Sequence, residues 1–282
     1  MKMSHKFSSR VGIQFMRIQI TFENHLKPTF LPINTNYYLV KLIDSLVYSY
    51  KRYLKSLMPA GIKRSDFNLY TFSQLFIPER IIEDFKIGIV SPQFYWYVSS
   101  PYYQFLGLIA KELRDNKFIK IDGKRFEVSN VQFITAPSFD KSEAQFTCLS
   151  PVTVYKKLSD RCDQGKGMYK DHYLMPEDGV EYYKSLKRDL ENKYYMIWKK
   201  KYSDIDFRME FDKKYIKKRR NKISKVIYLN HNEKSPNHVK GVLAPLHNQA
   251  DPEVLQLIYD AGLGQLNSLG FGMVETVNEP KY

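Results

Sequence analysis

The feature that most constrains this fold is a strand with one buried face, followed by a long amphipathic helix, near the start of the chain. Apolar residues alternate with polar ones over residues 16–22, and a period of two is typical of a half-buried strand. Residues 34–36 offer a helix cap. Apolar residues then recur at spacings of three and four over residues 38–57, which predicts an amphipathic helix. Its other face carries cations, namely Lys41, Lys51, Arg52 and Lys55.

The elements that follow extend this strand–helix pair into a known order. Strand patterns at 69–77, 85–99 and 124–135, with a helical pattern at 102–115, give β-α-β-β-α-β, the ferredoxin-like unit. A similar unit with insertions follows, with strands expected at 145–154, 206–211, 225–230, 239–244 and 271–277 and helices at 179–198 and 251–261. The predicted fold class is therefore α+β, with tandem ferredoxin-like (RRM-like) βαββαβ domains. We expect a tail at 1–15, an N-terminal domain at 16–140 and a C-terminal domain at 141–282.

The charge balance points to a polyanionic partner. The chain has 44 Lys and Arg against 30 Asp and Glu, a formal charge of +14, and a fold this basic attracts nucleic acid or an anionic membrane. No stretch approaches the ~20 apolar residues that a membrane span needs, and no secretory signal stands out, so nucleic acid is favoured and a cytoplasmic location is expected. Cys148 and Cys162 form neither a zinc pattern nor a disulfide framework.

A cluster of cations lies in the second half of the chain. Eight Lys and Arg fall within residues 213–225, interleaved with Tyr215 and followed by Tyr228. Such a cluster fits a hairpin that grips an RNA backbone, and Lys217, Arg219 and Arg220 are the candidates taken from it. The alternative is a solvated or disordered charged loop, because blocks of like charge often stay unfolded until they bind.

The sharpest motif is a glycine-rich segment at residues 262–272, between a short predicted helix and the last predicted strand. Glycine permits positive φ and close backbone approach, and successive N–H groups in such a segment can form a nest for phosphate oxygens. The alternative is a connector that only turns the chain. The order of helix before glycines excludes a Rossmann fingerprint, and no Gly-Lys-Ser/Thr follows as in a P-loop. The RNA-binding candidates here are Gly262, Gly264, Asn267, Ser268, Gly270 and Gly272.

This glycine segment, followed by Met-Val-Glu at 273–275, resembles the C-terminal signature of the CRISPR-associated repeat-RNA-processing endoribonucleases, often called "Cas-six". Residues 36–39, 69–73 and 147–151 are similar to that family as well. The resemblance covers about residues 16–277. It implies CRISPR repeat RNA as the partner, no cofactor and no metal, and it leaves open other subunits of a CRISPR effector complex and a homodimer.

The resemblance further implies a metal-independent cut, in which the RNA 2′-hydroxyl attacks the adjacent phosphate and leaves a 2′,3′-cyclic phosphate and a 5′-hydroxyl. This chemistry needs a base, an acid and stabilisation of the charged phosphorane. Family members place a histidine after the first helix, a tyrosine within that helix and a lysine beyond it. Here residues 37–69 contain no histidine, and Asp44 stands where the tyrosine is expected.

Substitutes for these positions are therefore the catalytic candidates. Tyr48 lies one turn beyond Asp44, and Lys63 or Arg64 matches the lysine. His25 is the first-ranked histidine, because some members use one from this region; the alternative is an ordinary exposed loop histidine. His172 and His247 have weaker claims. A route without histidine would use Lys41, Lys51, Lys55, Lys63 and Arg64 to position the RNA and stabilise charge. A member that carries RNA without cutting it is the alternative function.

Overall fold

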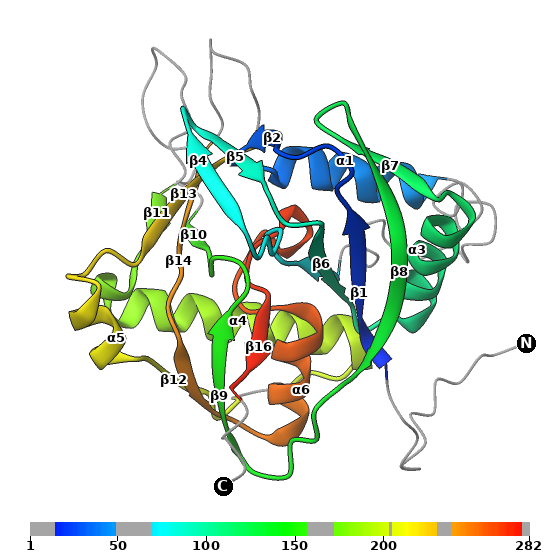
Figure 1. Cartoon of the computed structure of the whole chain (residues 1–282). Helices are drawn as coiled ribbons and strands as arrows, with labels where there is room; N and C mark the ends of the chain where they lie inside the picture. The colour runs from blue at the N-terminus through cyan, green and yellow to red at the C-terminus, as the bar shows by residue number, and fades with distance from the viewer. Residues whose placement is uncertain (1–14, 49–68, 157–171, 203–204, 230–237, 278–282) are drawn as a thin grey trace, which may run out of the picture.

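The computed structural model describes residues 15–48, 69–156, 172–202, 205–229 and 238–277. These residues form two main antiparallel sheets, each covered by helices and each with a hydrophobic core of its own, and three smaller sheets (Figure 1). The connector between the two sheets spans residues 136–142, and the predicted domain boundary at residue 140 lies within it. Among the described residues, no helix has the length and apolar character needed to cross a membrane.

The N-terminal sheet has the strand order β3-β6-β1-β8-β7. Its strands are β1 (Phe15–Glu23), β3 (Thr71–Phe72), β6 (Gln93–Ser99), β7 (Phe118–Ile121) and β8 (Lys124–Thr135). Helices α1 (Asn36–Leu46) and α3 (Tyr103–Asp115) pack on it. The inward residues of β1, which are Ile18, Ile20 and Phe22, are fully buried, as the alternation predicts. If β7 is left out and the other four strands are numbered as they follow one another in the chain, their order across the sheet is second–third–first–fourth. This is the ferredoxin-like arrangement.

The C-terminal sheet repeats this order as β12-β15-β9-β16. Its strands are β9 (Glu143–Cys148), β12 (Arg208–Phe211), β15 (Leu246–Gln249) and β16 (Val274–Thr276). Helices α4 (Val180–Trp198) and α6 (Pro252–Ala261) contribute the buried residues of the second core. The prediction of tandem ferredoxin-like domains is thus confirmed.

Several short elements are inserted into the two units. In the N-terminal half they form the small sheet β2-β5-β4, with β2 (Thr29–Pro32), β4 (Arg80–Glu83) and β5 (Lys86–Ile89). In the C-terminal half they are β10 (Val154–Lys156), β11 (His172–Leu174), α5 (Lys213–Lys218), β13 (Ser224–Tyr228) and β14 (His238–Val242), with 3-10 turns at Pro176–Asp178 and Asn267–Leu269. Strands β13 and β14 form an antiparallel hairpin beside the glycine segment.

The structure corrects four expectations about these elements. The single strand predicted at 85–99 is two strands, β5 and β6, in different sheets, and they are separated by a bend at residues 90–92. The strand predicted at 145–154 is likewise split into β9 and β10. Helix α1 ends at Leu46, ahead of the predicted end at 57, which lies outside the described residues. The third strand of the second sheet is β15, which was not predicted; the strand expected at 225–230 belongs to the inserted hairpin instead.

Candidate nucleic-acid interface

The basic segment folds into a short helix and a turn. The Asp212 side chain caps α5, accepting hydrogen bonds from the backbone N–H groups of Lys214 and Tyr215 at 2.8 and 3.0 Å, which satisfies two otherwise orphan donors. Arg220 and Asn221 follow with φ of 50° and 60°, and this left-handed turn sends the chain into β13. The disordered alternative is therefore wrong for this segment, and the expected hairpin begins only after it.

The cations of this segment face solvent and mostly lack acidic partners. Lys217, Arg219 and Arg220, the three candidates, are all exposed. Of the described residues, only Glu210 pairs with a cation of the segment, at 3.1 Å from Lys213 Nζ. The exposed members without an acidic partner are Lys214, Lys217, Lys218, Arg219, Arg220 and Lys222. Cations that lie so close together without acidic partners attract phosphates, and a nucleic acid that binds to such a cluster releases its counterions.

The glycine segment lies at the seam between the two domains. Gly262, Gly264, Gly270 and Gly272 all have positive φ, between 73° and 84°, and all are buried. A Cβ at Gly270 would overlap the ring of Phe72 in the first domain, and one at Gly264 would overlap the carbonyl of Thr153. Glycine is thus required here both for the conformation and for the close packing.

Backbone hydrogen bonds occupy many of the N–H groups that a phosphate nest would need. The N–H groups of Leu263, Gln265 and Gly272 donate to the carbonyls of Gly272, Thr153 and Pro151, all at 2.8 Å. Gly262 and Gly270 donate within the protein as well. Among the RNA-binding candidates, Asn267 is buried and donates to Phe271 O at 3.0 Å, whereas Ser268 is half-buried. The nest interpretation is therefore wrong for Gly262, Gly270 and Gly272, whose N–H groups are taken. Contact of the segment with RNA stays a prediction.

A buried lysine holds the glycine segment against α4. Lys193 Nζ donates to the carbonyls of Gly262 and Gly264, at 2.8 and 2.7 Å, and pairs with Asp189 at 2.7 Å. Its burial lowers its pKa, and burial raises the pKa of Asp189. Sequence reasoning missed this residue, because its position within a helix of many lysines gives no sign that it is buried.

An arginine links the two domains on the other side of the seam. Arg17 of β1 is fully buried, with Nη1 at 2.6 Å from Glu275 Oε2 in β16. Its Nη2 donates to the carbonyls of Tyr259 and Val274, at 3.0 and 2.8 Å, and the guanidinium lies 3.8 Å from the Tyr259 ring centroid. Because a buried cation is tolerated only with such partners, the first and last strands are fixed relative to each other.

The inserted hairpin contacts both domains. Ile227 and Val239 are buried against Phe271 of the glycine segment, and Lys225 Nζ donates to Gln74 Oε1 of the N-terminal domain at 2.9 Å. Burial lowers the pKa of Lys225, and the positive charge of Arg80 lowers it further. The hairpin therefore extends the cationic surface of α5 across the seam toward the first domain.

The structure does not bring the described catalytic candidates together. His25 is 65% exposed and lies 2.9 Å from Glu127 Oε2, Tyr48 is 66% exposed beyond the end of α1, and the Lys41 ammonium lies 4.2 Å from the Tyr37 ring centroid. Within the described part of the chain, no hydrogen bond or ion pair joins His25 to Tyr48 or Lys41. The other candidates from this region, Lys51, Arg52, Lys55, Lys63 and Arg64, lie outside the described residues, as does the side chain of His172.

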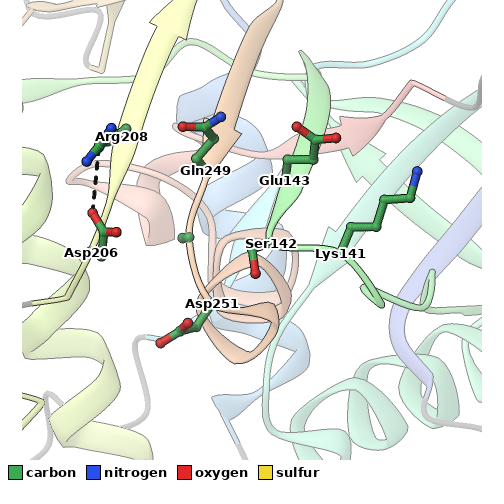
Figure 2. Close-up of a pocket in the computed structure, with 8 residues that line it drawn as sticks. Lys141, Ser142, Glu143, Asp206, Arg208, Gln249 and Asp251 are labelled. Atoms are coloured by element: carbon green, nitrogen blue, oxygen red, sulfur yellow. Dashed lines mark ion pairs between the residues drawn. The ribbon is translucent and has the colours of Figure 1, made fainter.

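A pocket of about 640 Å³ lies at the far end of the C-terminal sheet (Figure 2). Glu143, Asp206 and Asp251 line it along with Lys141 and Arg208, and Arg208 is within 3.7 Å of Asp206. His247 Nε2 lies 3.7 Å from Oε2 of Glu143, one of the lining residues. Three carboxylates against two cations disfavour a polyanion, so this pocket is not the candidate RNA site.

Comparisons with known proteins agree with this fold. The family model "CRISPR associated protein Cas6, C-terminal" matches residues 134–276, just over half of the chain. The sequence is 27% identical over 270 residues to CRISPR-associated endoribonuclease Cas6 1 of Methanocaldococcus jannaschii, with 94% of each chain covered. A Cas6-related protein of Pyrococcus furiosus superimposes with a TM-score of 0.76 at 24% identity, over 94% of this chain and 100% of that one. An RAMP protein described as binding different RNA substrates gives 0.74 at 24% identity, over 93% and 100%. The chain therefore belongs to the Cas6 family of CRISPR-associated proteins.

Proposed function

We propose that this chain is an endoribonuclease that binds CRISPR repeat RNA and cleaves precursor CRISPR RNA without a metal ion. The observation that carries the proposal is the exposed, uncompensated cationic surface of α5, which continues into a hairpin packed on the glycine segment. The endoribonuclease name of the M. jannaschii relative supports the activity. The RNA binding stated for the structurally similar RAMP protein supports the partner.

In the proposed reaction, the 2′-oxygen forms a bond to the adjacent phosphorus while the bond from phosphorus to the 5′-oxygen breaks. A base removes the proton of the 2′-hydroxyl, an acid protonates the leaving 5′-oxygen, and cations stabilise the phosphorane. We assign the proton transfers to His25 and Tyr48, and charge stabilisation to Lys63 and Arg64. The Glu127 carboxylate only accepts hydrogen bonds, so it favours the proton on Nε2 of His25 and leaves Nδ1 of the neutral ring to act as the base.

A second function is favoured by a specific observation. Residues 37–69 contain no histidine, and the described candidates do not contact one another. Both facts support a family member that binds repeat RNA and carries it intact, alone or as a subunit of an effector complex.

We also propose that two copies of the chain form a homodimer, and light scattering of the purified chain would test this.

Cleavage in a chelator separates the two functions. The protein is incubated with end-labelled repeat RNA in EDTA, and the products are resolved and tested for a cyclic phosphate. One cut that ends in a 2′,3′-cyclic phosphate supports the enzyme, whereas tight binding of intact RNA supports the carrier. Cleavage that requires added magnesium contradicts the proposed mechanism.

Variants then test the residue roles. We expect His25→Ala, Tyr48→Phe and Lys63→Ala to slow single-turnover cleavage. For the variants at His25 and Tyr48, which lose a proton transfer, the expected factor is roughly 10²–10⁴ each. His247→Ala is the matched control, since His247 is also a histidine beside a glutamate, 3.7 Å away, but it lies at the acidic pocket. Unchanged rates in the first three variants would remove the proposed site.

A further inference from the structure

The inserted hairpin of β13 and β14 has two different faces. Ile227 pairs with Val239, and both point inward to pack on Phe271, Leu266 and Leu269 of the glycine segment. Because side chains alternate across a strand, the flanking residues of both strands point the other way. The hairpin is therefore anchored by an apolar inner face, and its other face is exposed at the end where Tyr228 and His238 pair.

The outer face is aromatic and cationic. Tyr228 pairs directly with His238, and Val226 pairs with Lys240. Tyr228 is 44% exposed and Val226 41%, His238 is exposed, and Lys240 is half-buried. Within the described residues, Lys240 has no acidic partner, so its charge remains available to a ligand.

A tyrosine from a neighbouring strand, Tyr173, packs against the inner cluster and contacts His238 from that side. Tyr173 of β11 is half-buried, and its hydroxyl donates to the carbonyl of His238 at 2.9 Å. The ring centroids of Tyr173 and Tyr228 lie 6.4 and 6.2 Å from that of His238, with interplanar angles of 43° and 51°. The hydrogen bond fixes the position of Tyr173. The Tyr228 and His238 rings are tilted relative to each other, and both side chains are exposed to a ligand.

We propose that this outer face, made of Tyr228, His238 and Lys240, is a platform on which unpaired bases of a bound RNA stack. Every base has a π-face, and aromatic residues along a cationic groove are the usual means of holding single strands. The platform lies on the strand that follows the cations of α5, since Lys222 lies two residues before β13 and Tyr228 is the last residue of that strand. The inference rests on the proposed function, which it deepens by assigning the unpaired part of the substrate to a defined surface.

The charge of the surroundings favours nucleic acid over a protein partner. Six exposed cations without acidic partners precede the platform, and the chain as a whole carries +14. An acidic peptide would satisfy the cations, but it would not need two exposed aromatic rings paired at one hairpin end. Base stacking uses both features, since the phosphates meet the cations while the bases meet the rings.

Binding to labelled RNA tests the platform. Fluorescence anisotropy would measure affinity for single-stranded repeat RNA, for oligouridine and for a blunt RNA duplex. We expect Tyr228→Ala and His238→Ala each to weaken single-strand binding by roughly five- to 150-fold and to leave duplex binding nearly unchanged. Tyr228→Phe should retain wild-type affinity, because it keeps the ring. Tyr195→Ala on α4, where the ring is similarly exposed at 49%, is the matched control and should have no effect.

A second readout reports stacking itself. A 2-aminopurine placed in the single-stranded RNA should lose fluorescence on binding to the wild type and to Tyr228→Phe, and much less on binding to Tyr228→Ala. Circular dichroism would confirm that the variants unfold at the wild-type denaturant concentration. Unchanged affinity in both alanine variants, equal weakening of single strand and duplex, or weaker binding only to an acidic peptide would each overturn the proposal.

The two proposals fail in distinguishable ways. If the wild type binds and cuts repeat RNA while Tyr228→Ala and His238→Ala bind it normally, the platform is wrong and the proposed function stands. If oligouridine binding depends on Tyr228 but repeat RNA is neither preferred nor cut, the platform stands and the proposed function is wrong.

Discussion

Three glycine-to-alanine variants separate the contributions of space and backbone conformation in this fold. Gly270 lies in the glycine segment with φ of 84°, and an added Cβ would overlap the Phe72 ring and approach Asn36 Nδ2 to 2.6 Å. Gly123 has φ of 71°, but nothing lies within 4 Å of its added Cβ. Gly107, inside α3, has neither a positive φ nor a neighbour within 4 Å. The three positions therefore differ by one physical effect at a time.

The expected changes in the free energy of unfolding follow from these differences. Gly107→Ala should stabilise by about 0.5–1 kcal/mol, because alanine is the better helix former. Gly123→Ala should destabilise by about 1–2 kcal/mol, the cost of left-handed backbone for a residue with a Cβ. Gly270→Ala carries the same conformational cost plus about 1–3 kcal/mol for overpacking, or about 2–5 kcal/mol in total. Phe72 is fully buried and cannot withdraw into solvent.

Urea denaturation followed by far-ultraviolet circular dichroism would measure all three variants. The order of stability should be Gly107→Ala, wild type, Gly123→Ala and Gly270→Ala. If Gly270→Ala were no less stable than Gly123→Ala, the close packing of the glycine segment on the first domain would be refuted. Weaker RNA binding by a Gly270→Ala variant of wild-type stability would instead favour direct contact of the glycine with RNA.

Three further predictions follow from buried charges and from the cationic surface. Lys193→Met should destabilise the fold by about 3–5 kcal/mol in urea denaturation, because it leaves a carboxylate partner and two carbonyls buried without the ammonium; a change below about 1 kcal/mol would contradict this. For single-stranded RNA, the triple variant Lys217→Ala, Arg219→Ala and Arg220→Ala should reduce the magnitude of the slope of log affinity against log salt concentration by about 2. Fluorescence anisotropy at several salt concentrations would measure this slope. An unchanged slope would exclude these cations from phosphate contact. Burial raises the pKa of Asp260 to about 7, so the folded state holds a proton that the unfolded chain releases near pH 4. The contribution of this group to the free energy of unfolding therefore falls as pH rises from about 4 to 7. The stability gained by Asp260→Asn should be larger at pH 7.5 than at pH 5 in urea denaturation, and a gain independent of pH would contradict the assignment.

The regular elements were the most predictable part of the fold. Strand β8 was predicted with the bounds the structure has. Helices α3 and α4 were predicted to within a residue, because their buried residues recur at spacings of three and four. Strand β15 was missed because its residues are mostly polar. Its Asn248 is fully buried in the middle of the sheet, and no local pattern distinguishes such a residue from one in a loop. Tertiary context decided this strand.

The site was less predictable, for a related reason. The sequence identified the cations of α5 and the glycine segment as candidates, and the structure shows that these cations are exposed and these glycines buried. However, the backbone N–H groups of Gln265 and Gly272 donate to the carbonyls of Thr153 and Pro151, more than 100 residues away along the chain. The rings of Tyr228 and His238 likewise come from separate strands, β13 and β14. Of these, only Tyr228 was noted from sequence, by its position after the basic segment.

The ion pair between Arg17 and Glu275 also affects the order in which the two domains can fold during synthesis. The two residues are 258 positions apart, so on the ribosome the first sheet emerges long before the strand that carries its partner. Domains generally fold in order as they are synthesised, but here the first half holds an arginine whose acceptors all lie beyond residue 258. Until the last strand emerges, that guanidinium must stay hydrated. The nascent N-terminal half therefore keeps this surface exposed to water, and the two halves can dock only after β16 has left the ribosome.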